Sequence, residues 1–363
     1  MKYLNALNKI EGIGAQRLKL LLQHFATGEK IWKADLTEII QAGISQKIAE
    51  RIIYQRRKIN PDQELEKLKE HQIQIISFTD SEYPKLLREI PSAPYLLYLR
   101  GDKEILQTPS LAIVGSRKFT AYGKQVAFSL SQELARAGFT IVSGMALGID
   151  SFAHQGALNA SGKTIAVLGS SLDDSRIGPK QNFQLSRHII ANGALLSDYP
   201  LFTSANSFTF PARNRLMAGL TLGTIVIEAE EKSGTLITAK MATDFNREVF
   251  AVPGPIFSTT STGVHQLIKN GAKLVSGIQD ITEELSVQFS KASFLNQENQ
   301  KQPTIKMTKQ EEIIFKIING EPIHINRIIK LSKLETKKVS SALAMLEMNS
   351  LIKDIGGQNY IRI

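Results

Sequence analysis

The amino-acid sequence predicts an α/β protein built on a mostly parallel sheet, with helices before the sheet and a small helix-and-hairpin region after it. The first observation is the run 111–117, LAIVGSR, an apolar strand ending in a small-residue turn that carries one fixed positive charge. The second is that β-branched runs ending in Gly, Ser or an acid recur at 140–144, 164–170 and 224–228, with amphipathic stretches between them. Strands that alternate with helix-length segments indicate parallel strands joined by right-handed crossovers.

These four turns are expected at one edge of the sheet, at the carboxyl ends of the strands, where open α/β sheets bind ligands. Glycine in such a turn permits positive φ and close backbone approach, and the N-terminus of the following helix adds N–H donors. Any single glycine can equally serve only to close a tight turn. Four turns that converge on one edge, together with the cation of Arg117, favour phosphate binding.

The region before the sheet, residues 1–65, is predicted to be a helical domain of the SAM or helix-hairpin-helix kind. Short helical segments flank the turns at 12–14 and 43–45. A turn of this kind can offer backbone N–H groups to a phosphate. An ordinary turn between the helices of a bundle is an equally good interpretation. The sheet domain is then expected over residues 66–287, with an extra strand at 73–78.

The region after the sheet begins with residues 288–303, which are polar and lack periodicity, so we expect a flexible linker. Residues 304–363 predict a winged helix. Its three helices and its hairpin turn are expected at Lys309–Ile318, Ile325–Leu331, Thr336–Met348 and Gly356–Gly357. The third helix would be the one to enter a DNA major groove, but it has no Arg to read guanine. A protein contact or a weak phosphate contact is therefore favoured over sequence-specific DNA binding.

The composition argues against several classes of protein. The chain has no cysteine, so we expect no disulfide and no thiolate metal site, and its six histidines lack a metal-ligand spacing. No apolar run approaches the ~18 residues needed to span a membrane. The first residues also lack the apolar core of a signal peptide. We expect a cytoplasmic protein with no metal, no cofactor and no membrane partner.

The net charge of +10 points to an anionic partner, and its distribution says more than its sum. Residues 1–60 carry 11 basic and 5 acidic side chains, and residues 304–363 carry 10 and 6. The remaining residues, 61–303, carry 23 basic and 23 acidic side chains, so their net charge is zero. The sheet domain must therefore bind any polyanion through a local patch. The alternative for the two ends is that their excess charge serves only solubility.

Five motifs of the sheet domain resemble the DNA processing protein A (DprA/Smf) family. They are Gly115–Gly123, Ser143–His154, Phe210–Arg215, Ser233–Ala239 and Ala251–Gly254. The resemblance covers about residues 70–285, and many members have similar flanking domains. It implies an extended Rossmann fold that forms a homodimer. It also implies a non-enzymatic protein that binds single-stranded DNA during natural transformation, protects it and loads the RecA recombinase.

The residues at the edge agree with this implication. Arg117 can place two hydrogen bonds on a phosphate. Lys180 and Phe183 are three residues apart and follow a proline that suits the start of a helix, so their side chains are expected to point the same way. The Lys would then contact the DNA backbone and the Phe would stack on a base. In the alternative, Phe183 belongs to the core. The resemblance, which includes the Lys and the aromatic residue of this loop, favours DNA contact.

Four further polar residues each allow two interpretations, one functional and one structural. Arg213 and Arg215 could line a phosphate pocket or pair with Glu228 and Asp150. Asp150 and His154 could form a catalytic pair, but capping and packing are favoured. The complete set of predicted DNA-binding residues is Gly115, Ser116, Arg117, Gly144, Gly169, Lys180, Asn182, Phe183, Arg213, Arg215, Ser233, Gly234 and Thr235.

Two positions depart from the family's pattern. Members commonly have Arg where Leu147 stands and Asn where His265 stands, so one possible phosphate contact at the edge is in doubt. The proposed homodimer would use apolar surface around Ile256, Leu267 and Ile268, unless these residues pack within the monomer.

Two other functions compete with DNA loading. A phosphoribohydrolase of the lysine decarboxylase-like group would share the sheet but needs a catalytic Glu, and the run Glu230–Thr238 has no acid after its Gly-Thr pair. A regulator that binds duplex DNA is suggested only by the C-terminal region. We therefore favour the single-stranded DNA binder.

Overall fold

The computed structural model describes residues 1–286, 308–318, 322–348, 351–354 and 356–362. The chain divides into two compact units, Met1–Gln288 and Phe289–Ile363, which are described separately. The predicted linker, residues 288–303, lies outside the described residues. No described helix is both long enough and apolar enough to cross a membrane.

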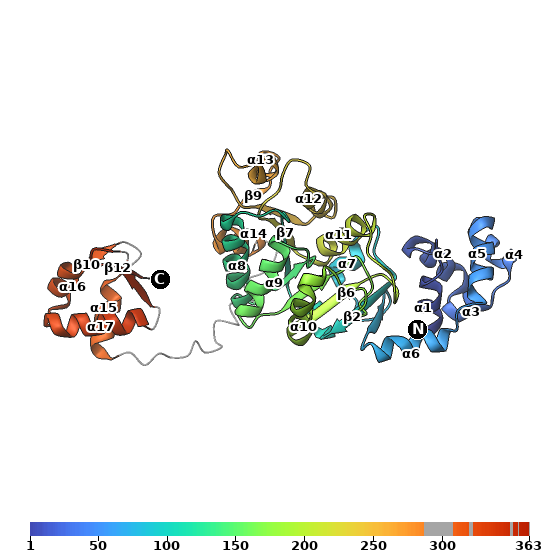
Figure 1. Ribbon diagram of the computed structural model, residues 1–363, viewed down its shortest axis with the longest axis horizontal. Helices are drawn as coiled ribbons and strands as arrows, with labels where there is room; N and C mark the ends of the chain where they lie inside the picture. Colours follow the sequence, from blue (N-terminus) through green and yellow to red (C-terminus); the bar gives the residue numbers. More distant parts are fainter. Residues whose placement is uncertain (287–307, 319–321, 349–350, 355, 363) are drawn as a thin grey trace. The chain divides into compact units, whose positions relative to one another are not determined.

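The first unit begins with six helices (Figure 1). They are α1 (Lys2–Asn8), α2 (Ala15–Phe25), α3 (Gly28–Lys33), α4 (Leu36–Gln41), α5 (Gln46–Arg56) and α6 (Pro61–Glu70). The two predicted turns are built alike, because Gly12 and Gly43 have φ values of 91° and 87°, which favour glycine, and the isoleucine after each is buried. Helices therefore form around these turns as predicted.

These helices have an apolar cluster of their own and also contact the sheet. The hydroxyl of Tyr98 donates to Asn5 Oδ1 at 2.9 Å and accepts from Asn8 Nδ2 at 3.1 Å. Tyr98 is buried, and burial raises its pKa above the ordinary value, so the phenol keeps its proton to donate. The boundary at residue 65 stays a prediction.

The sheet has nine strands in the order β1-β2-β6-β5-β4-β3-β7-β8-β9. The pairs β1–β2 and β2–β6 are antiparallel and the other six pairs are parallel. The strands are β1 (Gln74–Ser77), β2 (Leu96–Gly101), β3 (Ser110–Val114), β4 (Thr140–Ser143), β5 (Thr164–Val167), β6 (Gly193–Ser197), β7 (Gly223–Val226), β8 (Glu248–Ala251) and β9 (Lys273–Leu274). The predicted mostly parallel α/β class is confirmed.

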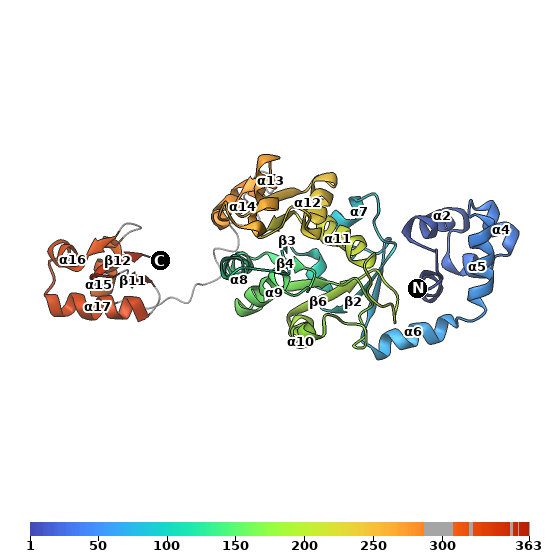
Figure 2. The same cartoon turned by 45° about the horizontal axis from the view of Figure 1, so that its top comes forward.

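Helices cover both faces of this sheet. Figures 1 and 2 show α8 (Ala121–Arg136), α9 (Ile149–Asn159) and α10 (Phe183–Asn192) on one side, and α11 (Thr209–Leu220) and α12 (Gly234–Asp244) on the other. The remaining elements of this unit are α7 (Lys85–Glu89), η1 (Lys103–Gln107), η2 (Lys180–Asn182), η3 (Thr259–Ser261), α13 (Thr262–Lys269) and α14 (Ile278–Ser286).

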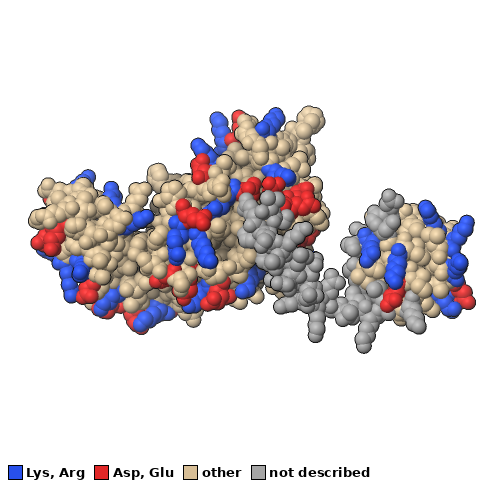
Figure 3. Space-filling model, turned by 180° about the vertical axis from the view of Figure 1, so that it is seen from behind, with Lys and Arg blue, Asp and Glu red and all other residues tan. Residues whose placement is uncertain are grey.

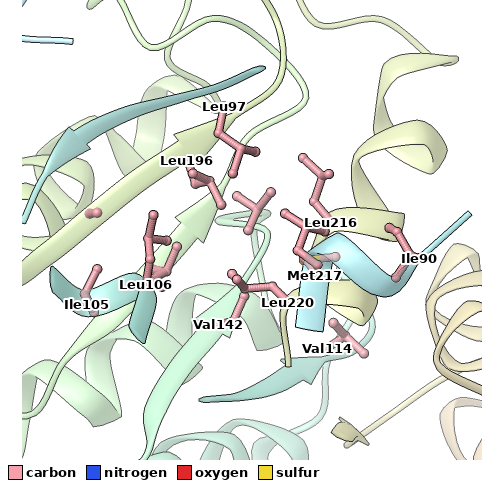
Figure 4. Close-up of a cluster of buried hydrophobic side chains, with 14 of the residues drawn as sticks. Ile90, Leu97, Ile105, Leu106, Val114, Val142, Leu196, Leu216, Met217 and Leu220 are labelled. Atoms are coloured by element: carbon pink, nitrogen blue, oxygen red, sulfur yellow. The ribbon is translucent and has the colours of Figure 1, made fainter. Parts of the chain in front are cut away.

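The largest apolar cluster lies between α11 and the strands. Figure 4 shows Leu216, Met217 and Leu220 of α11 facing Val114 and Leu196 of the sheet. All five side chains are buried, and each buried aliphatic side chain of this size stabilises the fold by about 1.5–3 kcal/mol. This packing fixes the start of α11 above the carboxyl ends of the strands.

The second unit has the predicted winged-helix order. It contains α15 (Lys309–Ile317), β10 (Ile323–His324), α16 (Ile325–Ser332), α17 (Thr336–Met348), β11 (Ile352–Asp354) and β12 (Asn359–Arg362). Its strands form a sheet in the order β10-β12-β11. The two-residue strand β10 is an addition to the three helices and the hairpin expected from the sequence.

Candidate functional site

The connections diverge at the carboxyl ends of β3 and β7. From β3 the chain passes through α8 on one face to β4, whereas β7, on the other side of β3, is reached through α11 on the opposite face. Such a topological switch point is where ligands bind in open α/β sheets. A cavity of about 390 Å³ lies there, lined by the segment after β3, the segment after β7 and the start of α11. Its lining includes Gly115, Ser116, Arg117, Arg213, Ser233, Gly234 and Thr235.

A second cavity of about 210 Å³ adjoins the first, since both are lined by Arg117, Ala146, Phe210 and Arg213. It extends past β4 and β5, and its lining also includes Gly144, Gly169, Gly178 and Pro179. The structure thus brings together nine of the thirteen predicted site residues. Lys180, Asn182, Phe183 and Arg215 lie outside the linings of these two cavities.

Arg117 is an exposed cation of the site, and exposed Lys118 beside it also lines the larger cavity. The guanidinium carbon of Arg117 lies 5.5 Å from the centroid of the Phe210 ring, a cation–π distance that orients the group over the cavities. The turn before it is shaped by Ser116, whose hydroxyl accepts from the Lys118 N–H at 3.0 Å and donates to the Lys118 carbonyl at 2.6 Å. Ser116 therefore uses its polar groups to hold the turn that presents Arg117.

Glu228 anchors the helix that follows this turn. Its carboxylate is buried and accepts from the Thr120 N–H at 3.1 Å and the Thr120 hydroxyl at 2.6 Å. The same hydroxyl accepts from the N–H of Gly123 and so caps α8. Glu228 is therefore occupied in fixing α8 and is not the partner of Arg213 or Arg215.

The start of α12 supplies backbone donors to the larger cavity. Ser233 caps the helix by accepting from the Thr235 N–H at 3.2 Å. The space beside Gly234 is open, with no atom within 4 Å of the position a Cβ would take. The N-terminus of an eleven-residue helix carries partial positive charge and unpaired N–H groups, which favour an anion at this end of the cavity.

The three glycines at the strand ends correct one expectation. Gly115, Gly144 and Gly169 do not have positive φ. Close packing explains them instead, because a Cβ at Gly115 would lie 2.6 Å from Cγ1 of Ile149, and one at Gly144 would collide with the guanidinium of Arg213. Two of these glycines thus make room for the protein's own side chains.

Arg213 is an interior cation at the floor of both cavities. It is 5% exposed, its Nη1 donates to the carbonyl of Val167, and its Nε donates to Asn214 Oδ1 at 3.1 Å. Burial lowers the pKa of Arg213 to about 10, opposed by the charge of Asp150 and assisted by that of Arg117. The group stays charged at neutral pH and adds positive potential beneath Arg117.

Two predicted contacts require correction. Arg215 forms a half-buried ion pair with Asp198 and donates to the carbonyl of Ser92 at 2.5 Å, so it ties α11 to the sheet. Asn182 is buried, and its Nδ2 donates to the carbonyl of Met145 and to the Ser151 hydroxyl, both at 2.8 Å. Both residues therefore have partners within the protein.

Lys180 and Phe183 differ in exposure. Lys180 is exposed and directly follows Pro179, which lines the second cavity. Phe183 is half-buried and packs against an apolar cluster that includes Leu172, Leu185 and Ile189. The core alternative for Phe183 is therefore partly correct.

Asp150 and His154 do not form a catalytic pair. Asp150 Oδ2 accepts from the N–H groups of Gly144 and Ala146, which closes the loop before α9 rather than capping that helix. Burial raises the pKa of Asp150 while the charge of Arg213 opposes the shift. His154 is fully buried, with Nδ1 2.7 Å from Thr164 Oγ1, and burial lowers its pKa to about 3. His154 is therefore a neutral packing residue.

Sequence reasoning missed Phe210, Lys118 and Ile237, which also line the larger cavity. Phe210 was visible only as the first residue of a family motif, and nothing in the pattern indicated that its ring lies under Arg117. Over the residues that the structure describes, no cluster of His, Asp and Glu could hold a metal ion. Figure 3 shows basic and acidic side chains interspersed over the visible face of the sheet domain, in keeping with its neutral balance.

Fold and site together define an extended Rossmann-type α/β protein with a cation-bearing edge at its switch point, flanked by helical hairpins and a winged helix. The chain belongs to the family described as DNA recombination-mediator protein A, which matches residues 74–286. The flanking regions match a SAM-like helix-hairpin-helix tandem at residues 4–58 and a DprA winged helix domain at residues 298–358.

Known relatives agree over most of the chain. Protein Smf of Synechocystis sp. is 37% identical over 99% of this chain and 98% of its own length, and DNA processing protein DprA of Bacillus subtilis is 38% identical over 70% and 89%. The crystal structure of DprA from Streptococcus pneumoniae has a TM-score of 0.70 at 36% identity, covering 78% of this chain and 98% of that one. A structure of DprA from Helicobacter pylori, described by its single-stranded DNA binding mode, has a TM-score of 0.54 at 33% identity, covering 60% and 97%.

Proposed function

We propose that this protein binds single-stranded DNA along the carboxyl edge of its sheet, protects it during natural transformation and passes it to the RecA recombinase. The observation that carries the proposal is the placement of exposed Arg117 over Phe210, between two adjoining cavities. A cation beside an exposed ring is the minimum needed to hold a phosphate and stack a base. The mechanism needs no bond-making step, so we propose a non-enzymatic role.

The shape of the edge favours a polymer over a single nucleotide. The two cavities share a wall, and the second reaches Pro179, next to exposed Lys180. Arg117 and Lys180 would hold successive parts of the sugar–phosphate backbone, with Arg213 adding potential from below and the α12 N-terminus binding a further phosphate. Because the surrounding domain is neutral, the affinity of one site should be modest and sensitive to salt.

Family membership supports the finer parts of the proposal. The Helicobacter pylori relative is described by its binding of single-stranded DNA, and the family is described as a mediator of recombination. Handing a bound strand to RecA is the step that such a mediator would perform, and a protein with this role would act in the cytoplasm. The phosphoribohydrolase alternative has less support, because the Asp150 carboxylate is bonded to backbone N–H groups and no acid follows Thr235 on the first turn of α12.

We also propose that the protein is a homodimer formed through the sheet domain. Of the expected interface residues, Leu267 and Ile268 pack against the monomer's own apolar cluster, in keeping with the alternative given for them. Ile256 and its neighbour Phe257 are 76% and 95% exposed, so this loop is the better candidate for the contact. Two linked edges would raise the avidity for one strand through effective concentration. In analytical ultracentrifugation, the variant Ile256→Asp/Phe257→Asp should sediment as a monomer; an unchanged dimer would place the interface elsewhere.

The binding site is tested by fluorescence anisotropy with a labelled oligothymidylate at about 0.1 M salt. Arg117→Glu should bind at least tenfold more weakly, because it removes an exposed cation that lines both cavities and adds a repulsive charge. Arg136→Glu is the matched control, since Arg136 is an exposed arginine at the other end of α8, and it should bind like wild type. Equal binding by a folded Arg117→Glu variant would show that the edge is not the site.

A further inference from the structure

Lys180, Phe183 and Arg187 form a stripe along η2 and α10. They stand at i, i+3 and i+7, which places them on one face of a helix, and the two cations are about 10 Å apart along its axis. Building on the proposed function, we propose that Arg187 is a further DNA-contact residue. Its guanidinium binds the phosphate backbone of the strand, and the Phe183 ring serves as its platform rather than as a surface for a base.

The position of Arg187 on the ring is the first observation behind this assignment. The guanidinium carbon lies 5.0 Å from the centroid of Phe183, within cation–π range. The Phe183 side chain also packs against the buried cluster that includes Leu185 and Ile189. A base could reach the face of the ring under Arg187 only by displacing the guanidinium. The exposed chemistry of this stripe is therefore cationic rather than aromatic.

A shared carboxylate holds Arg187 in this position. Asp174 accepts from Arg187 Nη2 and from Arg100 Nη1, each at 2.5 Å. Arg100 is buried and also donates to the carbonyl of Leu172 at 3.3 Å, so the far end of the network is fixed in the interior. Burial of Asp174 favours a higher pKa, but the hydrogen bond and charge of Arg100, with Arg187, outweigh it and lower the pKa of Asp174. The carboxylate is therefore ionised at neutral pH.

The charge balance leaves Arg187 able to bind an anion. Two guanidinium groups share one carboxylate, so the network of Arg100, Asp174 and Arg187 keeps one net positive charge. The side chain of Arg187 is 40% exposed, whereas that of Arg100 is 8% exposed, so the unsatisfied donors on the solvent side belong to Arg187. A planar guanidinium with fixed orientation suits the two oxygens of a phosphate.

The stripe also extends the path proposed for the strand. Lys180 follows Pro179 at the wall of the second cavity, and Arg187 lies two helical turns further along α10. A backbone that leaves the cavity along this helix meets one cation after another. We therefore infer a phosphate-binding track that runs from the edge of the sheet onto α10.

The test measures oligothymidylate binding over a range of salt concentrations for wild type, Arg187→Gln, Phe183→Leu and the double variant, after thermal melts confirm that each is folded. Loss of one phosphate contact should reduce the slope of log Kobs against log salt by about 0.7 and weaken binding at 0.1 M salt about fivefold. Because the ring acts through Arg187, the double variant should bind no more weakly than Arg187→Gln. Arg187→Lys should keep the slope, and Arg136→Gln should match wild type in both measures.

Two results would overturn the proposal. An unchanged slope for Arg187→Gln would show that this cation meets no phosphate. A further loss on adding Phe183→Leu to Arg187→Gln would show that the ring contacts DNA itself. Failure of the proposed function would give a different result, namely an Arg117→Glu variant that binds DNA like wild type. The two failures can be told apart because Arg117 is unchanged in every variant of the present test.

Discussion

The guanidinium of Arg213 occupies the space that a side chain at Gly144 would need. Gly144 begins the strand-to-helix turn after β4, and Arg213 enters from α11 on the opposite face of the sheet. The first position of the turn has no side chain because a buried cation passes beside it and donates to the carbonyl of Val167 on β5. The edge of the sheet is therefore held together by an interior arginine before any ligand arrives.

This contact predicts that Gly144→Ala destabilises the protein. The added methyl group must push Arg213 away from Val167, and overpacking of a dense interior costs about 1–3 kcal/mol. Urea unfolding followed by circular dichroism measures the change. Gly234→Ala is the control, because its Cβ would meet no atom within 4 Å on the first turn of α12, and its stability should stay within about 0.5 kcal/mol of wild type. Equal stability of the two variants would contradict the packing argument.

Phe210 is expected to contribute to DNA binding through its ring. It is partly exposed, lines both cavities and lies under Arg117. Phe210→Leu keeps an apolar side chain but removes the surface for stacking, which is worth about 1–3 kcal/mol per base. Oligothymidylate affinity should fall about fivefold or more. Phe202→Leu is the control, because its ring is 44% exposed and lies outside both cavity linings, so this variant should bind the oligonucleotide as wild type does. A Phe210→Leu variant with full affinity would remove Phe210 from the site.

His154 makes stability depend on pH. The Thr164 hydroxyl donates to the carbonyl of Ile141, so Nδ1 of His154 is the donor to Thr164 Oγ1, and buried Nε2 has no partner among the described residues. Burial lowers the folded-state pKa to about 3, whereas the unfolded value is 6.5, so between these values the unfolded chain binds one more proton. Stability should therefore fall with pH below 6.5, by about 2 kcal/mol between pH 7 and pH 5.

Unfolding measured at both pH values in His154→Asn isolates this effect. The asparagine amide retains a donor toward Thr164 but does not titrate, so this variant should lose less stability on acidification than wild type. His188→Gln, at an exposed histidine of α10, should keep the wild-type difference. If His154→Asn shows the full wild-type loss, other groups carry the pH dependence.

Glu228 is expected to matter for stability rather than for binding. Its carboxylate accepts from both the N–H and the hydroxyl of Thr120, the residue that caps α8. Glu228→Ala leaves these half-buried donors without their carboxylate partner, at a cost of about 1–3 kcal/mol. Glu230→Ala, at an exposed acid two residues on, should change the stability by less than about 0.5 kcal/mol. Thermal unfolding of both variants decides the matter, and a Glu228→Ala protein as stable as wild type would refute the anchoring role.

The sequence predicted the strands whose apolar runs end in a recognisable turn. Residues 111–114, 140–143 and 164–167 all fall within strands, and the three helices of the winged-helix region were located to within a residue or two. Strands β2, β6, β8 and β9 of the nine-stranded sheet were missed. All five residues of β6 are buried, so this strand shows no alternation of apolar and polar side chains, and local pattern distinguishes it poorly from other apolar segments.

The site was predicted in its location more than in its members. Arg117, Ser233 and Gly234 line the cavity at the switch point, because parallel strands must end at a common edge. Arg215 and Asn182 were assigned to DNA because polar residues in a motif look alike in sequence whether they face a ligand or the interior. Their partners, Asp198 and Met145, are distant in the chain and meet them only in the fold.

By itself, the sequence determined the α/β class, the edge where the parallel strands end and the cation that stands on it, since these follow from periodicity and from residues next to one another. Only the tertiary structure decided which polar groups remain available. The packing of α11 made Arg213 an interior cation, Asp198 took Arg215, and Phe210 came to lie under Arg117. The reason is physical: a buried polar group must find partners wherever the fold supplies them, and those partners come from segments that local sequence cannot relate.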